Sequence, residues 1–444
     1  MRLTELSAEQ RLVMSERLRA TVRGQGTAPL TVTQEGIWLA ESISRGASGY
    51  HDIAEVALTG PLDVEALRRS LAAVTARHQV LRAGVSGEDG YPFMHFDAPP
   101  PDALVDDRVG PPDDADPTFE LAPFDLQRGP LWRWRLRRVD AASWRLTVVL
   151  HHLITDGWSV AVLFESLLRA YSAGGLPLDE PAASYAERIV QRVRSERRDD
   201  EARAAEEVRA TVAGLSAGVD LAPAAGKPAL EADVVPVPLT RPERDSLERI
   251  AAHSRMSGFT VALAVFAAVV PDLTAMPAET AAAGLRVSVP VLHRSPPDLQ
   301  QLGCFTSLGI LELFTSPGPW RRKLELSQAS LRRLLSCPVS YRALLKGTEA
   351  RRAFGDPLTN LGVREFNVTR QERRVGDLVV SRLPRRMLHT WHDLSLSVPS
   401  RAAAADAEWE LLVPRGRWTE GSAPAAARLF AEQARSLIAS VGSP

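Results

Sequence analysis

Cysteine is scarce in this sequence. Only Cys304 and Cys337 occur among the 444 residues. Two cysteines are too few for a disulfide framework, and these two lack the spacing of metal ligands. We therefore expect both to be reduced and structural, and we expect no bound metal.

Long apolar runs are missing too. The first 26 residues carry charges every few positions and hold no apolar core of the length that a signal peptide needs. No window approaches about 18 uninterrupted apolar residues, so no transmembrane helix is expected. The sequence predicts a cytoplasmic protein that does not associate with a membrane.

An excess of charge of either sign is also absent. Lys and Arg total 53 and Asp and Glu total 54, which gives a formal net charge of -1. Without a basic excess, a nucleic-acid partner is not indicated. Hydrophobic residues at 45% and charged residues at 24% are close to the averages for soluble globular proteins, so disorder is not indicated either.

A chain of this length is too long for one compact core. Signals typical of strands and of helices alternate along it, which predicts a mixed α/β (α+β) fold of two lobes. We place one lobe at residues 1–175 and the other at 176–444. An amphipathic helix is expected over the first 22 residues, and a linker or long loop over 213–233.

The segment after Pro61 gives a clear helix prediction. Asp63 is a suitable N-cap, and the apolar residues that follow it share one helical face; they are Val64, Leu67, Leu71 and Val74. Strands are expected at 53–60, 131–139, 144–153, 285–291, 305–314 and 376–382, and helices at 159–175, 190–212, 241–255, 258–271 and from Ala423.

The stretch WRLTVVLHHLITDGWS, residues 144–159, carries the candidate chemistry. Side chains alternate faces along a strand, so of His151 and His152 one is the working group and the other packs. A neutral imidazole can accept a proton from an attacking amine or hydroxyl near pH 7. Asp156 would orient the ring or pair with a distant arginine, and the Gly157 amide would help to hold an oxyanion.

Three other interpretations compete for this pattern. A metal site would need ligands on one face, which adjacent histidines do not provide. A serine hydrolase would need a nucleophile elbow such as G-x-S-x-G, which the sequence lacks. For a lone His, the default interpretation is a core residue with satisfied hydrogen bonds. Two adjacent histidines followed at a fixed spacing by Asp-Gly are rare by chance, which favours a functional role.

HHLITDG resembles the HHxxxDG signature of condensation domains of nonribosomal peptide synthetases. Other segments resemble the family's motifs in the family's order: LTVTQEGIW with Gln34 and Trp38, RHxxLR at Arg77, His78, Leu81 and Arg82, PFDLQRGPLWRWRL, the GxF motif at Gly303 and Phe305, and HDLSLSV at 392–398. The likeness runs from about residue 29 to the end of the chain. Three segments depart from it: Ala83 stands in place of the Thr of LRT, Thr306 to Leu308 follow Phe305 where the family has FVNT, and the late QDYPFE-type motif is barely visible near Cys337 and Pro338.

The resemblance implies two lobes similar to chloramphenicol acetyltransferase, arranged as a V-shaped pseudo-dimer with a central active-site channel. It makes His152 the active-site residue, as general base or as positioner of the nucleophile. It also favours Asp156 as a brace that pairs with an arginine, because a buried carboxylate needs a partner. Arg294 is the arginine we expect in this ion pair; the family commonly has Gly-Arg there, and this chain has His293.

The activity that the resemblance implies is that of a free-standing condensation enzyme in natural-product or antibiotic biosynthesis. It would transfer an acyl or aminoacyl group from a carrier-protein thioester to an amine or alcohol, forming an amide or ester. It would bind no cofactor of its own, because an acyl or peptidyl carrier protein, docking in trans, supplies the phosphopantetheine arm. The acceptor would be a small molecule or carrier-bound, and the enzyme a monomer. The candidate basic docking cluster is either Arg321, Arg322 and Lys323 or Arg373 and Arg374, although a charge cluster is usually only a solvated face.

Other relatives of the family remain as alternatives. A coenzyme A-dependent acyltransferase of the plant type would carry DFGWG, which is absent here. An epimerising relative would need further motifs, and heterocyclising relatives replace both histidines with aspartates. A degenerate condensation-like module that only recruits other proteins would tend to lose the histidine motif.

Overall fold

The computed structural model describes sixteen stretches of the chain: residues 26–44, 49–88, 91–101, 103–106, 109–110, 117–178, 184–196, 221, 231–274, 284–315, 317–336, 359–366, 372–383, 389–390, 392–400 and 407–441. The helix expected over the first 22 residues lies outside them, as do Cys337 and most of 213–233. The fold and the site below are those of the described residues.

Contacts within the chain divide it into two compact units. Unit 1 comprises residues 1–198, 293–306 and 370–386, and unit 2 comprises 199–292, 307–369 and 387–444. The sequence placed a single boundary after residue 175. The contacts instead return two later segments to the first unit, because these segments pair with elements from the first half of the chain.

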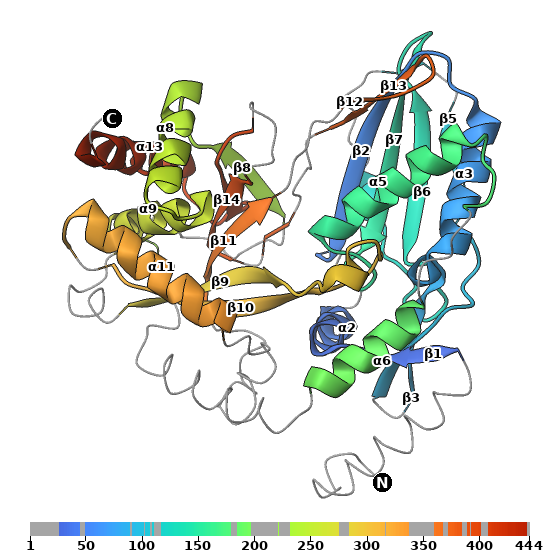
Figure 1. Cartoon of the computed structure of the whole chain (residues 1–444), viewed down its shortest axis with the longest axis horizontal. Helices are drawn as coiled ribbons and strands as arrows, with labels where there is room; N and C mark the ends of the chain where they lie inside the picture. Colours follow the sequence, from blue (N-terminus) through green and yellow to red (C-terminus); the bar gives the residue numbers. More distant parts are fainter. Residues whose placement is uncertain are drawn as a thin grey trace, which may run out of the picture. The chain divides into compact units, whose positions relative to one another are not determined.

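Unit 1 is built on an open six-stranded sheet in the order β12-β13-β2-β7-β6-β5 (Figure 1). Its strands are β2 (His51–Thr59), β5 (Ala103–Asp106), β6 (Trp132–Arg138), β7 (Ser143–His151), β12 (Glu372–Val375) and β13 (Leu378–Arg382). The central strand β7 is antiparallel to both β2 and β6. The strand expected at 376–382 is present as β13, but it extends this sheet beside β2 rather than the sheet of the other unit.

Two helices, α3 (Val64–Arg77) and α5 (Gly157–Ser172), pack against each other and share the hydrophobic core of this sheet. Asp63 caps α3, and its Oδ1 accepts a hydrogen bond from the Ala66 N–H at 2.8 Å. The buried face of α3 includes Leu67, Leu71 and Val74, each at most 4% exposed. The helix and its predicted face are confirmed.

Smaller elements complete unit 1. A three-stranded sheet has the order β1-β4-β3. The elements are β1 (Thr27–Pro29), α2 (Val32–Ser44), the 3-10 turn η2 (Gln79–Arg82), β3 (Gly84–Glu88), β4 (Tyr91–His95), α4 (Pro117–Glu120), α6 (Tyr185–Glu196) and the 3-10 turn η3 (Pro296–Asp298).

Unit 2 has its own open six-stranded sheet, in the order β10-β9-β11-β14-β15-β8. Its elements are β8 (Ala232–Pro236), α8 (Arg241–His253), α9 (Gly258–Leu273), β9 (Leu285–Leu292), β10 (Thr306–Leu313), α11 (Trp320–Ser336), β11 (Leu361–Phe366), β14 (Leu394–Pro399), β15 (Glu410–Pro414) and α13 (Ser422–Val441). β11 runs parallel to β9 and β14. The helices expected at 241–255, 258–271 and from Ala423 are all present.

Helix α9 is apolar around most of its circumference because it is the buried core helix of unit 2, packed against α8, α11 and α13. Across the described residues, no single helix combines the length and the hydropathy of a membrane span. The pair α8 and α9 reaches both limits only when the two helices are counted together, and they are bent by 110°.

Candidate active site

His151 and His152 stand at the end of β7 and take different surroundings. His151 is the register partner of His51, and their rings lie 6.0 Å apart. The backbone N–H of His152 donates to the Tyr50 carbonyl at 2.7 Å, one step further along the same strand pair. Because successive side chains alternate faces, the two imidazoles enter different environments. The structure thus separates the histidines as their adjacency suggested.

The His152 ring is held through one nitrogen. Its Nδ1 lies 2.9 Å from the Thr155 carbonyl oxygen, and since a carbonyl only accepts, Nδ1 carries the proton. In the neutral ring Nε2 then has its lone pair available to accept a proton. The side chain is 33% exposed. Burial lowers the pKa of His152 below 6.5, against the opposing effects of the Asp156 charge and the Thr155 hydrogen bond, so the ring is neutral at pH 7.

His151 is a packing residue. Its side chain is 2% exposed, and its Nδ1 accepts a hydrogen bond from the Leu153 N–H at 3.1 Å. The proton is therefore on Nε2, which lies 3.7 Å from Oε1 of Glu41. Burial, followed by the charges of His152 and Arg133, lowers the pKa of His151 to about 3. A ring that stays neutral and enclosed holds the loop but cannot reach a substrate.

Asp156 has no oxygen left for His152. It is fully buried and is the N-cap of α5, where Oδ1 accepts from the Ser159 N–H at 2.8 Å. Arg294 donates through Nη2 to Oδ1 at 2.9 Å and to Oδ2 at 3.0 Å. Oδ2 also accepts from the Phe305 N–H at 3.0 Å. Asp156 thus fastens the start of α5 to the segment 293–306.

Arg294, the arginine expected to meet Asp156, is 1% exposed and makes further bonds to its own segment. Its Nη1 donates to the carbonyls of Asp298 and Gln301, and its guanidinium lies 4.4 Å from the Phe305 ring centre. Ser159 joins the same network, since its Oγ accepts from the Gly303 N–H at 3.0 Å. The sequence pattern alone gave no role to Ser159.

Gly157 is the first residue of α5 and is exposed. The first N–H groups of a helix have no acceptor inside the helix, and they give its N-terminus a partial positive charge. Trp158, the next residue, donates through Nε1 to the Leu299 carbonyl at 2.8 Å. The start of α5 is therefore anchored by Trp158, and its exposed Gly157 end carries the partial positive charge of the helix N-terminus.

Gln34, in the LTVTQEGIW segment, is held by hydrogen bonds at both ends of its side-chain amide. Its side chain is fully buried, and Nε2 donates to the Leu153 carbonyl at 2.7 Å and to Tyr185 Oη at 3.1 Å. Its Oε1 accepts from the Thr31 N–H at 3.0 Å. Helix α2 is thereby tied to the loop that carries His152.

The RHxxLR residues are structural. His78 caps α3 through its backbone, and its Nε2 lies 3.0 Å from Ser166 Oγ, while burial lowers its pKa to about 4. Arg82 donates to the carbonyls of Thr75 and Ala76 at the end of α3. The motif thus closes one helix and joins it to α5.

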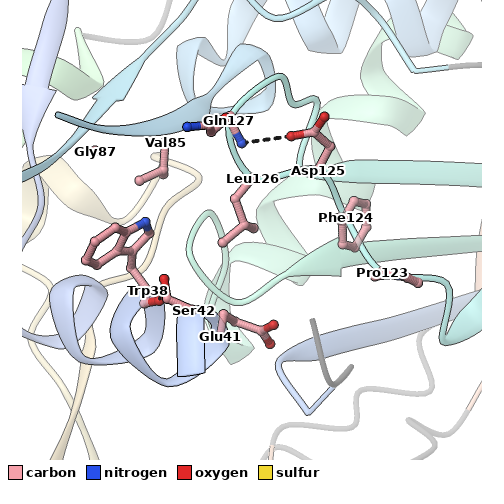
Figure 2. Close-up of a pocket in the computed structure, with 10 residues that line it drawn as sticks. All are labelled: Trp38, Glu41, Ser42, Val85, Gly87, Pro123, Phe124, Asp125, Leu126 and Gln127. Atoms are coloured by element: carbon pink, nitrogen blue, oxygen red, sulfur yellow. Dashed lines mark hydrogen bonds between the residues drawn. The ribbon is translucent and has the colours of Figure 1, made fainter. Parts of the chain in front are cut away.

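A pocket of about 390 Å³ is lined by residues of α2, of β3 and of the segment 123–127 (Figure 2). Two of its lining residues contact His151: Glu41 through the 3.7 Å approach and Phe124 with ring centres 5.9 Å apart. Among the described residues ten line it, and His152 is not one of them: Trp38, Glu41, Ser42, Val85, Gly87, Pro123, Phe124, Asp125, Leu126 and Gln127. The pocket is therefore distinct from the immediate surroundings of His152.

Other sequence-based candidates fall in these places. Cys304 is buried and forms no disulfide, and burial raises the pKa of its thiol to about 12. Within the described stretches, no three His, Cys, Asp or Glu side chains are grouped as metal ligands. Arg321 lies 3.1 Å from Glu325 on α11, with Arg322 and Lys323 beside it, and Arg373 and Arg374 are exposed on β12.

The family model for the condensation domain matches residues 24–313. Among curated proteins, phosphinothricin tripeptide synthetase PhsC of Streptomyces viridochromogenes is 29% identical over 356 residues, which cover 71% of this chain and 31% of the synthetase. Cyclosporin synthetase simA of Tolypocladium inflatum is 30% identical over 296 residues, or 65% of this chain and 2% of the synthetase. The chain thus spans only a small part of these relatives.

Solved structures share the fold at low identity. The SgcC5 protein of Streptomyces globisporus superimposes with a TM-score of 0.76 and 17% identity, covering 93% of this chain and 98% of that one. The first condensation domain of the calcium-dependent antibiotic synthetase gives 0.75 and 18%, covering 94% and 97%. The family model and the fold therefore agree with the family that the histidine motif indicated. The chain belongs to the condensation-domain family of nonribosomal peptide synthetases.

Proposed function

We propose that this protein transfers an acyl or aminoacyl group from the phosphopantetheine thioester of a carrier protein to an amine or alcohol acceptor, forming an amide or an ester. Condensation domains are in general acyl or peptidyl transferases that act on carrier-bound substrates. The single observation that carries the proposal for this chain is the state of His152: neutral, partly exposed, and fixed through Nδ1 with Nε2 left to accept a proton.

The proposed role of His152 is that of general base and positioner. Nε2 accepts the N–H or O–H proton of the acceptor as its nitrogen or oxygen attacks the thioester carbonyl carbon. The carbon–sulfur bond then breaks, and the thiolate takes up the proton that Nε2 holds. The new amide or ester and the free thiol are the products, so the imidazole returns to its starting state.

The remaining motif residues support this step without exchanging protons. Asp156 is committed to Arg294 and Ser159, so its proposed role is to hold the loop at the start of α5. The exposed Gly157 end of α5 is the proposed source of positive potential for the oxyanion that develops on the carbonyl oxygen.

The proposal is tested with carrier proteins loaded with a panel of acyl and aminoacyl groups and offered with amines and alcohols, the products being identified by mass spectrometry. We expect the wild type to form a product with a competent pair, and the His152→Ala variant to be slower by about 10²- to 10⁴-fold. A His152→Ala variant with the full rate would refute the role of this residue.

The same assay distinguishes the alternatives. One neighbouring structure is a starter condensation domain of rhizomide synthetase in complex with C8-CoA, so acyl-coenzyme A is included as a donor. Another is a complex of the X-domain and OxyB from teicoplanin biosynthesis. A chain that bound partner proteins but formed no product with any donor would be a recruitment module rather than a transferase.

A further inference from the structure

We propose that Asp52 is a positioning residue for His152: its carboxylate orients the imidazole and stabilises the imidazolium that forms during transfer. This inference rests on the function proposed above and adds to it a residue that lies outside the HHxxxDG motif. Asp52 would then orient the His152 ring, which is one of the two roles that the sequence analysis considered for Asp156.

The geometry places the two groups in direct reach. Oδ2 of Asp52 lies 3.3 Å from Nδ1 of His152, and the Asp52 side chain is 6% exposed. The same Nδ1 donates to the Thr155 carbonyl at 2.9 Å. The N–H of Nδ1 therefore lies near one carbonyl oxygen and one carboxylate oxygen. Nε2, the unprotonated nitrogen, is left to accept the proton of the acceptor.

The pairing of β2 with β7 explains why these residues meet. Asp52 is the register partner of Leu150, and the His152 N–H is bonded to the Tyr50 carbonyl, so His152 is a diagonal neighbour of Asp52 across the strand pair. The residues that follow Asp52 at alternate positions, Ala54 and Val56, belong to the hydrophobic core of unit 1. Asp52 thus occupies a core-facing position, where its charge is removed from water.

Among the charged groups around His152, Asp52 is the one best placed to stabilise the imidazolium. The charge of Asp156 also raises the pKa of His152, but it is compensated by Arg294 at 2.9 Å. His151, the neighbour on β7, stays neutral because of its burial. A buried carboxylate beside the ring interacts with it more strongly than an exposed one would, since the local dielectric is low.

The test compares Asp52→Asn with Glu55→Gln. Both substitutions remove one buried carboxylate from β2, but Glu55 accepts a hydrogen bond from Thr147 Oγ1 at 2.9 Å and lies at a position of opposite parity. The titration of His152 is followed by NMR with isotope-labelled histidine, its signal being assigned from the His152→Gln spectrum. The kcat/KM of acyl transfer is measured against pH in parallel.

We expect Asp52→Asn to lower the pKa of His152 and to reduce kcat/KM by about tenfold or more, with Glu55→Gln changing neither. An unchanged His152 titration in folded Asp52→Asn would overturn the inference, whatever happens to the rate. If the wild type turns over no substrate but the titration still shifts, the Asp52 contact stands and the proposed function fails. Should Asp52→Asn not fold, the Asp52 carboxylate is titrated in wild type and in His152→Gln, and equal curves overturn the inference.

Discussion

Arg294 and Asp156 form an ion pair in which Nη2 and Oδ1 are 2.9 Å apart and the two side chains are 1% and 0% exposed. The residues are separated by 138 positions in the sequence. Every oxygen of the carboxylate is hydrogen-bonded, as a charge in a dry environment requires. The aspartate of the histidine motif is thus a structural fastening within unit 1.

Removing one partner of this pair should destabilise the protein strongly. Arg294→Met or Asp156→Leu leaves an uncompensated buried charge, and we expect a loss of about 3–5 kcal/mol in the free energy of unfolding. The double variant should lose clearly less than the sum, because it leaves no lone charge. Urea unfolding of the four proteins measures this. Additive losses would show that the two side chains do not interact.

Acid should weaken the fold before the carboxylates titrate. Burial lowers the pKa of His151 to about 3 and those of His78 and His392 to about 4, from 6.5 in the unfolded chain. Between those pKa values the unfolded chain binds protons that the folded chain excludes. The free energy of unfolding is therefore unaffected by these histidines above pH 6.5, and it decreases as the pH falls toward the folded pKa values. Each group contributes a slope of about 1.4 kcal/mol per pH unit.

The His151→Asn variant checks this account. Asparagine places its Oδ1 near the position of Nδ1, so it keeps an acceptor for the Leu153 N–H but cannot titrate. The free energy of unfolding, measured with urea between pH 5 and pH 6.5, should depend less steeply on pH than in the wild type. The difference in slope should correspond to about one bound proton. An equal slope would mean that His151 is not held neutral in the folded protein.

Local sequence patterns were sufficient to predict features that depend only on residues a few positions apart. The capping Asp63 and the spacing of Leu67, Leu71 and Val74 predicted α3, and strand alternation predicted that His151 and His152 would differ in surroundings. The motif resemblance led to the family that the comparisons then showed. These features depend on neighbours within a few positions in the chain.

Partners from other strands could not be read from the sequence. The segment 378–382 has a clear strand pattern, but its pairing with β2 in unit 1 depends on the whole chain path. Asp52 sits in HDIAEV, a stretch with no signal for chemistry, and it approaches His152 only because β2 and β7 pair in one register. A shift of one residue would turn it to the other face.

Gln34 should be needed for the position of the histidine loop. Gln34→Leu keeps the side-chain volume but leaves the Leu153 carbonyl and Thr31 N–H without this partner, and we expect a loss of about 1–3 kcal/mol in unfolding free energy. The matched change Gln127→Leu, at an exposed position, should cost less than about 0.5 kcal/mol. Thermal and urea unfolding of both variants compare them. Equal stabilities would show that the buried amide is dispensable.

Gly303 of the GxF motif should tolerate no side chain. A Cβ at this position would lie 2.2 Å from Cε2 of Tyr185 and 2.8 Å from Cε2 of Phe305, whose rings pack edge to face with centres 5.9 Å apart. Both rings are almost fully buried, so neither can move aside without disturbing the core that carries the Asp156 contacts. We expect Gly303→Ala to cost about 3 kcal/mol or more.

The control for this substitution is Gly36→Ala in α2. Apart from the neighbouring backbone of α2, no heavy atom of the described residues lies within 4 Å of a Cβ built there. Alanine favours a helix over glycine by about 1 kcal/mol, so this variant should be as stable as the wild type or more stable. Urea unfolding of the two variants separates steric exclusion from a general intolerance of glycine replacement. A stable Gly303→Ala protein would mean that Tyr185 and Phe305 can repack, and the GxF glycine would then require another explanation.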